Sequence, residues 1–213
     1  MNKVVKRVIV LALALSVAMF SMAWAETGGK IIAPMPAGVD VNALQDGIYP
    51  VAFEPGDVTV DDDGIVINAV RVYAQDWYDL VDVNTLEVGD TIIVEGEEVP
   101  VMTIGRADFI EINEGAEGVE AFCLGTEEDT NGFTVRGLDD MHTYTEQGET
   151  ALRIDSSATF TDAWDIESEP VTVDYDGIVE AIQTSRNDSF VPYNTTVRVE
   201  AGAIVEINRI YTP

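Results

Sequence analysis

The segment VTVDDDGIVINAVRVYA, residues Val58–Ala74, carries the pattern on which the predicted fold depends. A short apolar run over Asp57–Asp61 leads into an acidic turn, and β-branched residues then alternate with small or polar ones over Ile65–Ala74. Such alternation is typical of a half-buried strand, and Gly64 can supply the positive φ that a tight turn needs. The segment therefore predicts a β-hairpin that turns at Gly64.

Nearly the same nine residues recur from position 171. Val171–Val179 reads VTVDYDGIV and differs from Val58–Val66 only by Tyr175 in place of Asp62. A duplicated domain would carry its hydrophobic pattern well beyond nine residues, and the identity stops at both ends of this stretch. We interpret the repeat as one solution for a strand and a turn, used twice.

The two copies are predicted to continue differently. After Asp176 the apolar residues Ile178, Val179 and Ile182 fall on one face of a helix, with Asp176 placed as its N-cap. A second short helix is expected over Asp76–Leu86, with Asp76 as its N-cap.

The rest of the chain from Asp46 onward reads as short strands between Gly, Asp and Asn turns. Many short strands at this spacing predict a mainly β fold, an antiparallel sandwich or barrel-like sheets with one or two short helices. Besides the hairpin, the expected strands are Gly47–Phe53, Thr91–Glu95, Val99–Ile104, Asp108–Ile112, Val119–Leu124, Phe133–Arg136, Ala151–Ile154, Thr159–Thr161, Val171–Val173, Thr196–Glu200 and Ala203–Tyr211.

The N-terminus has the features of a signal peptide. Lys3, Lys6 and Arg7 precede an uncharged run that ends in Ala23-Trp24-Ala25, a small-x-small cleavage site. We expect residues 1–25 to be removed and the protein to be secreted or extracellular, without membrane insertion after signal removal. Residues 26–45 are expected to form a flexible tether, and residues 46–213 a β-rich globular region, either undivided or divided near 139–150.

The mature chain is strongly acidic. Three of the 11 basic residues and none of the 39 acidic residues lie in the leader, so its removal changes the net charge from −28 to −31. Nucleic acids and anionic membranes bind proteins through Lys and Arg, so neither is an expected partner. The acidity favours basic partners, and the expected partner is an unknown protein or glycan.

Two segments resemble a known group of proteins. The hairpin pattern LEVGDTIIVEGEEVPV, Leu86–Val101, and the ending FVPYNTTVRVEAGAIVEI, Phe190–Ile207, are similar to uncharacterised exported proteins of anaerobic Gram-positive bacteria. The resemblance implies an exported all-β domain and transfers no catalytic residue.

Calcium is the metal that the acidic turns suggest, because hard cations prefer several oxygen ligands. Compared with an EF-hand loop, each copy of the repeat keeps only the central residues, which are Asp61, Asp63 and Gly64 in the first and Asp174, Asp176 and Gly177 in the second. Thr59 and Thr172 replace the first ligand, and Val70 and Gln183 replace the bidentate Glu. Ordinary turn chemistry is the competing interpretation for these residues and for the acidic turn Glu127–Gly132.

Other kinds of site find little support. His142 is the only imidazole and Cys123 the only thiol, so a site built on several His or Cys ligands cannot form. A pair of catalytic carboxylates cannot be located from sequence alone. Trp77, Tyr78 and Trp164 could form a stacking platform, and Trp164 is the better surface candidate.

No catalytic or cofactor-binding residue is assigned, and the metal-binding residues, if any, are unknown. We predict an exported, non-enzymatic β-domain protein that acts as an interaction module outside the cell or at its envelope. The alternatives are a secreted carboxylate-dependent hydrolase acting on a glycan and a calcium-stabilised module.

Overall fold

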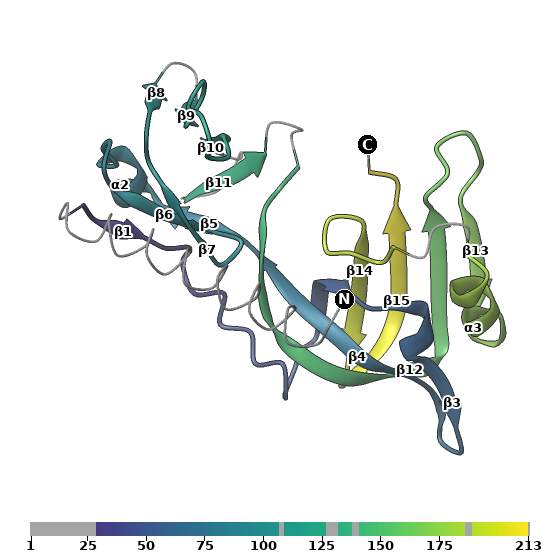
Figure 1. Cartoon of the computed structure of the whole chain (residues 1–213). Helices are drawn as coiled ribbons and strands as arrows, with labels where there is room; N and C mark the ends of the chain where they lie inside the picture. The colour runs from purple at the N-terminus through teal and green to yellow at the C-terminus, as the bar shows by residue number, and fades with distance from the viewer. Residues whose placement is uncertain (1–28, 107–108, 127–131, 138–140, 186–188, 213) are drawn as a thin grey trace, which may run out of the picture. The chain divides into compact units, whose positions relative to one another are not determined.

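The chain forms two compact units, seen in the computed structural model shown in Figure 1. The structure describes residues 29–106, 109–126, 132–137, 141–185 and 189–212, so the predicted leader lies outside the described residues. The barrel unit comprises Met35–Asp76 and Asp139–Pro213. The inserted unit comprises the chain up to Pro34 together with Trp77–Leu138. The prediction of a mainly β fold with barrel-like sheets and short helices is confirmed.

In its described residues the barrel unit has seven strands and one α-helix. In chain order these are β2 (Gly47–Ala52), β3 (Val58–Asp61), β4 (Gly64–Gln75), β12 (Tyr144–Ala163), β13 (Val171–Asp174), α3 (Tyr175–Gln183), β14 (Thr195–Glu200) and β15 (Ala203–Ile210), with a 3₁₀ turn at Pro55–Asp57.

Five of these strands close into a ring. β12 pairs with β15, β15 with β14, β14 with β2, β2 with β4, and β4 again with β12. All these pairs are antiparallel except β12–β15, which is parallel. When β2, β4, β12, β14 and β15 are numbered 1 to 5 in chain order, their order around the ring is 1-2-3-5-4. The helix α3 lies between strands 3 and 4 in the chain. This is the strand order of the OB fold, a small Greek-key barrel.

The two remaining strands each pair with one strand of the ring. β3 forms the predicted hairpin with β4, and Gly64 has a φ of 119° at its turn. β13 pairs with the last part of β12, at Thr159–Asp162. Since β15 occupies the other edge of β12, β13 lies along the same edge as β4.

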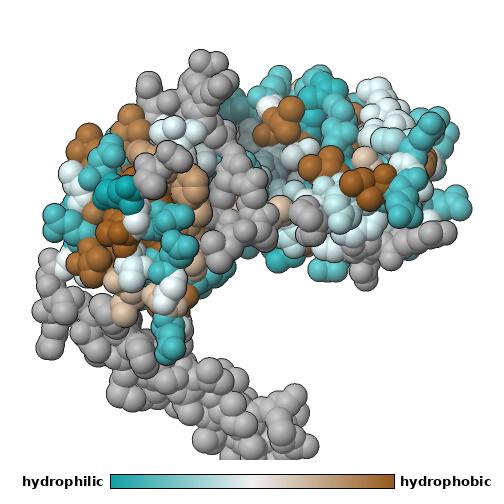
Figure 2. Space-filling model, turned by 90° about the horizontal axis from the view of Figure 1, so that it is seen from above, coloured by the Kyte–Doolittle hydropathy of each residue, from teal (hydrophilic) through white to brown (hydrophobic). Residues whose placement is uncertain are grey.

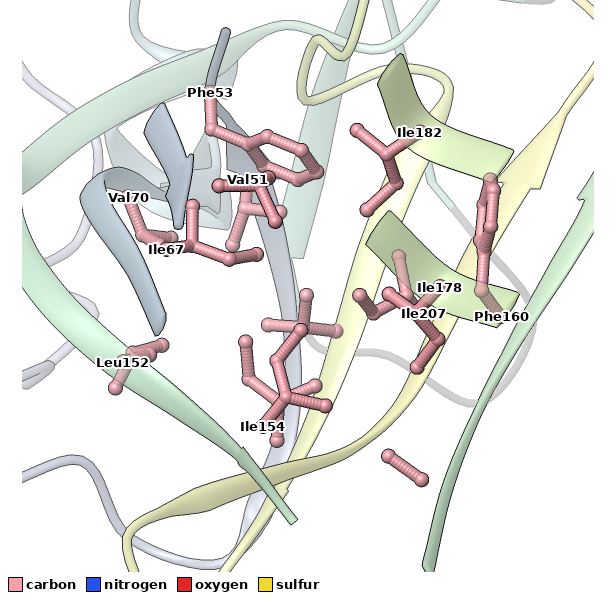
Figure 3. Packing of buried hydrophobic residues seen from close by; sticks show 14 of the residues in the cluster. Val51, Phe53, Ile67, Val70, Leu152, Ile154, Phe160, Ile178, Ile182 and Ile207 are labelled. Carbon is pink, nitrogen blue, oxygen red and sulfur yellow. The ribbon is translucent and has the colours of Figure 1, made fainter. Parts of the chain in front are cut away.

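The core of the barrel unit is formed by apolar side chains from the strands and from α3. Figure 3 shows these side chains pointing toward one another. Ile178 and Ile182 of α3 are fully buried among them, as the helical spacing of the sequence predicts. The helix begins two residues earlier than predicted, at Tyr175, so its N-cap is Asp174 and Asp176 lies in its first turn.

The inserted unit enters the connection between β4 and β12. One sheet has the order β1 (Ile31–Ile32), β6 (Thr91–Val94), β7 (Glu97–Pro100). The other has the order β5 (Trp77–Asp79), β11 (Gly132–Gly137), β10 (Phe122–Thr126), β9 (Ile110–Ile112), β8 (Ile104–Arg106). A second apolar core, including Ile92, Ile112 and Leu124, fills this unit.

The helix predicted over Asp76–Leu86 is wrong in its first half. Trp77–Asp79 forms β5, because its backbone pairs with β11. The helix α2 covers only Leu80–Asn84, and Asp79 caps it by accepting hydrogen bonds from the N–H groups of Val81 and Asp82. Asp76 is buried instead, and its Oδ1 accepts a hydrogen bond from Thr145 Oγ1 at 2.6 Å.

Several strand boundaries also differ from prediction. The separate strands expected at Ala151–Ile154 and Thr159–Thr161 are parts of the 20-residue β12, whose polar residues lie at exposed or half-buried positions. The strand expected over Val99–Ile104 is divided between β7 and β8.

The described part of the expected tether is packed against the units. Lys30 donates its backbone N–H to Asp90 Oδ1 and its Nζ to Thr85, and Ile32 is buried. Val39, Val41 and Leu44 pack on the barrel core. Among the described residues, no helix is long and apolar enough to cross a membrane.

Candidate functional site

The two copies of the repeated sequence meet in the barrel unit. Tyr175, the residue that distinguishes the second copy, places its hydroxyl against the turn of the first. The N–H of Ile65 donates a hydrogen bond to Tyr175 Oη at 3.1 Å. A Cβ on Gly64 would lie only 2.6 Å from the same oxygen. The repeat therefore builds one junction, in which β13 ends and β4 begins along the same edge of β12.

Arg153 ties the acidic turn to β12. Its guanidinium donates two hydrogen bonds to Asp61, to Oδ1 at 3.0 Å and to Oδ2 at 2.9 Å, and lies 3.7 Å from Asp63 Oδ2. The hydrogen bond from Arg153, assisted by the N–H of Asp63, lowers the pKa of Asp61 below its ordinary value. Both oxygens of Asp61 thus face a cation that the protein itself supplies.

The candidate calcium ligands of the second copy have separate roles. Asp174 is paired in β13 and precedes α3, and Asp176 is an exposed residue of the first helical turn. The part of the chain that the structure describes holds no group of three or more His, Cys, Asp or Glu arranged for a metal ion. The acidic turn Glu127–Gly132 lies outside the described residues except for Gly132, the first residue of β11. The calcium site stays a hypothesis.

The remaining sequence candidates belong to different units or to the core. His142 Nδ1 is 3.0 Å from Gln75 Nε2 in the barrel unit, whereas Cys123 lies on β10 of the inserted unit, opposite Glu111. Tyr78 is fully buried and donates its hydroxyl to the carbonyl of Ile93. Tyr78 is therefore a core residue and cannot contribute to an aromatic platform at the surface.

One pair of carboxyl groups does interact. Glu111 is hydrogen-bonded to Glu114, and this contact, with partial desolvation and charge repulsion, raises the pKa of Glu111. Glycosidases hold their two carboxyl groups about 5 Å or more apart so that a sugar carbon or a water fits between them. A pair in direct contact does not provide that space.

Arg209 organises a more elaborate cluster at one end of the barrel unit. Its side chain is only 1% exposed, although it carries a charge. It donates from Nε to Asp162 Oδ1 at 3.0 Å, and from one terminal nitrogen to Asp162 Oδ2 and Ser185 Oγ, each at 2.5 Å. Burying a charge is costly unless it is paired and hydrogen-bonded, and Asp162 meets both requirements.

Aromatic rings enclose the same guanidinium. Its central carbon lies 4.5 Å from the ring centroid of Phe190 and 5.9 Å from that of Trp164. Trp164 in turn packs against Tyr211, with ring centroids 5.8 Å apart and planes tilted by 48°. Arg209 therefore contacts Trp164, which in turn contacts Tyr211, so the three side chains form one packed cluster.

Further apolar side chains are exposed on the segments next to the strand ends at this end of the barrel unit. At this end of the barrel β12 and β15 finish, with Ala163 opposite Ile210, and β14 begins, with Thr195 opposite Arg209. Ile166 is 74% exposed, Ile210 54%, Tyr193 45% and Tyr211 42%.

Acidic residues are exposed in the same region of the chain. Asp165, Glu167 and Glu169 lie in the exposed connection between β12 and β13, next to Trp164 and Ile166 in the chain. Figure 2 looks down on the face where β12 and β15 end and shows separate apolar groups among hydrophilic ones. Tryptophan and tyrosine side chains at a protein surface are residue types enriched at interaction sites.

Sequence reasoning identified Trp164 but missed its partners. Arg209 and Tyr211 lie on an ordinary strand pattern, Ala203–Tyr211, in which an arginine is expected at the surface. The scarcity of cations was one available signal. A single Arg in an apolar strand of an acidic protein is expected to pair with a carboxylate, because a buried charge needs a partner. Comparison of the chain with protein families, with curated proteins and with solved structures gave no match.

Proposed function

We propose that the protein is an exported, non-enzymatic interaction module that works at the cell envelope or outside the cell. The observation that carries this proposal is the Trp164–Tyr211 pair at one end of the barrel unit, where Trp164 packs against the buried Arg209. Trp, Tyr and Arg are the residue types that contribute most to binding at interfaces. A rigid arrangement also lowers the entropy cost of binding, because little is left to order.

The predicted leader supports the location. A positive segment, an uncharged run and the Ala23-Trp24-Ala25 site together are typical of export. N-terminal sequencing of the protein recovered from culture medium should give Glu26 as its first residue. Retention of the intact leader in the cytoplasm would contradict the proposed location.

Binding is tested with the mature chain, residues 26–213, and envelope material from the producing organism. We expect saturable co-sedimentation with either cell walls stripped of protein or reconstituted envelope proteins. Absence of binding to both materials would contradict the proposed function. Turnover of a soluble polysaccharide by the same preparation would contradict its non-enzymatic character and favour the hydrolase alternative.

A further inference from the structure

The N-terminal segment connects the two units in addition to the connections around the inserted unit. The chain passes between the units after Pro34, after Asp76 and after Leu138. The last two passages are close to paired backbone, since the N–H of Asp76 donates a hydrogen bond to the carbonyl of Thr143 at 3.0 Å. Two connections that start side by side can bend together, and units joined in this way are expected to move relative to each other. The first passage is a third connection, and we call residues 29–44 the strap.

One end of the strap is anchored in the inserted unit. The N–H of Lys30 donates to Asp90 Oδ1 at 2.8 Å, and the carbonyl of Lys30 accepts a hydrogen bond from the N–H of Thr91 at 2.8 Å. Lys30 Nζ donates to both the carbonyl and Oγ1 of Thr85. Ile32 is 3% exposed and belongs to the apolar core of this unit. Hydrogen bonds and apolar burial therefore hold this end together.

The other end of the strap is anchored in the barrel unit. Val39, Val41 and Leu44 pack against its apolar core. Gly148 permits this contact, because a Cβ at that position would lie only 3.1 Å from Val41 Cγ2. Between the two anchors, residues 35–38 are exposed and form no hydrogen bond within the described part of the chain. The strap is thus a short exposed link between two packed ends.

We propose that the strap is a restraint that keeps the two units within a narrow range of arrangements. Ile32 and Val39 are seven residues apart, so the chain between the two anchors can span at most about 25 Å. A short link anchored at both ends limits how far the connection beside Asp76 can bend. The inference concerns the motion of the units, and it holds whatever partner the protein binds.

The test lengthens the strap without removing either anchor. An insertion of about 12 Gly and Ser residues between Pro36 and Ala37 raises the largest span of the link to about 70 Å. The matched control carries the same insertion between Ser168 and Glu169, in the exposed connection between β12 and β13. That connection lies within the barrel unit, so its length should not affect the motion of the units.

Spin labels measure the distance between the units in the mature chain. Glu98→Cys places one label on β7 of the inserted unit and Glu180→Cys the other on α3 of the barrel unit, both at exposed positions. Cys123→Ser removes the only native thiol. Double electron–electron resonance should give a narrow distance distribution, which the strap insertion broadens about twofold or more and the control insertion leaves unchanged.

A second variant tests the anchor. Ile32→Asp places a charge in the core of the inserted unit and should release this end of the strap, so it too should broaden the distribution. Far-UV circular dichroism of each variant shows whether both units remain folded. A distribution that stays narrow in the lengthened strap would overturn the proposal, as would a distribution that is already broad in the parent. Unfolding of the lengthened variant would show that residues 29–44 belong to the two cores instead of restraining their motion, and would contradict it as well.

Discussion

The hydroxyl of Tyr175 accepts a hydrogen bond from the backbone N–H of Ile65 at 3.1 Å, joining residues that are 110 positions apart in the chain. These residues belong to the two copies of one repeated sequence. The bond lies where β13 ends and β4 begins on the same edge of β12. The pairing of β4 with β12 ends at Val66, so the N–H of Ile65 has no partner in β12. The hydroxyl of Tyr175 provides the acceptor for this N–H.

Replacing Tyr175 with Phe should destabilise the barrel unit by about 1–2 kcal/mol, because the part-buried N–H of Ile65 loses its acceptor. Urea denaturation measures the loss, and amide exchange of Ile65 should accelerate in the variant. Tyr49→Phe is the control, since the Tyr49 hydroxyl donates to the carbonyl of Gln45 in an exposed position. Equal losses for both variants would show that the hydrogen bond to Ile65 contributes no more to stability than the exposed hydrogen bond of Tyr49.

Gly64→Ala should destabilise more than a comparable change at Gly202. Both glycines have positive φ, 119° and 80°, so alanine introduces backbone strain of about 1–3 kcal/mol at either position, and more at Gly64, whose φ lies further from the left-handed region that other residues adopt. Only at Gly64 would the new Cβ also lie 2.6 Å from Tyr175 Oη, whereas Gly202 has open space. Urea denaturation of both variants gives the difference.

A double-mutant cycle separates the contact from the strain. In the Tyr175→Phe background the oxygen that clashes is absent, so Gly64→Ala should cost less there than in the parent. Strict additivity of the two changes would refute the steric explanation.

Acid should weaken the junction of the acidic turn with β12. Arg153 lowers the pKa of Asp61 in the folded state, so the unfolded chain binds the proton more tightly. The stability that this pair contributes is present above the ordinary carboxyl pKa, near 3.8, and is lost as pH falls through the lower folded value. Asp61→Asn should flatten the pH dependence of stability below about pH 4, as measured by urea melts. Asp62→Asn is the control, because Asp62 forms no ion pair within the described part of the chain, and an equal effect there would contradict the assignment.

Arg209→Met should cost about 3 kcal/mol or more, because it leaves Asp162 and Ser185 without their buried donor. Arg209→Lys should recover only part of this loss, since a single ammonium cannot reproduce the fork that reaches both partners. The exposed cation Arg198, paired with Glu206 at 2.9 Å, serves as a control whose removal should cost about 1 kcal/mol or less. Thermal or urea melts followed by tryptophan fluorescence measure all three, and similar costs for Arg198 and Arg209 would refute the structural role of the buried pair.

Calcium and magnesium should stabilise the mature chain equally at equal ionic strength. Asp61 is already paired with Arg153, so a calcium ion would have to displace that cation. A specific site saturated about a hundredfold above its dissociation constant adds about 2.7 kcal/mol, which raises the melting temperature by about 5–10 °C for a chain of this size. A calcium-selective shift of that order, lost in Asp61→Asn with Asp63→Asn, would revive the calcium-stabilised module.

The sequence alone was sufficient for those features that depend on neighbours in the chain. Alternation over Ile65–Ala74 and the need for positive φ at Gly64 predicted the hairpin correctly, because both are properties of a few consecutive residues. The spacing of Ile178 and Ile182 likewise predicted the buried face of α3. Where local signals competed, as at Asp76–Asp79, pairing with β11 overrode the helical spacing.

The arrangement of the candidate site was decided by tertiary structure. Arg209, Asp162 and Trp164 come together only because β12 and β15 run side by side in a closed barrel, and Phe190 reaches them from the connection after α3. The meeting of the two repeated turns has the same origin, since the edge of β12 holds both β13 and β4. Sequence thus determined the local alternation, the turn residues and the acidic character of this protein. Barrel closure decided which side chains became neighbours, because the long-range strand pairings that create those contacts leave no local pattern in the chain.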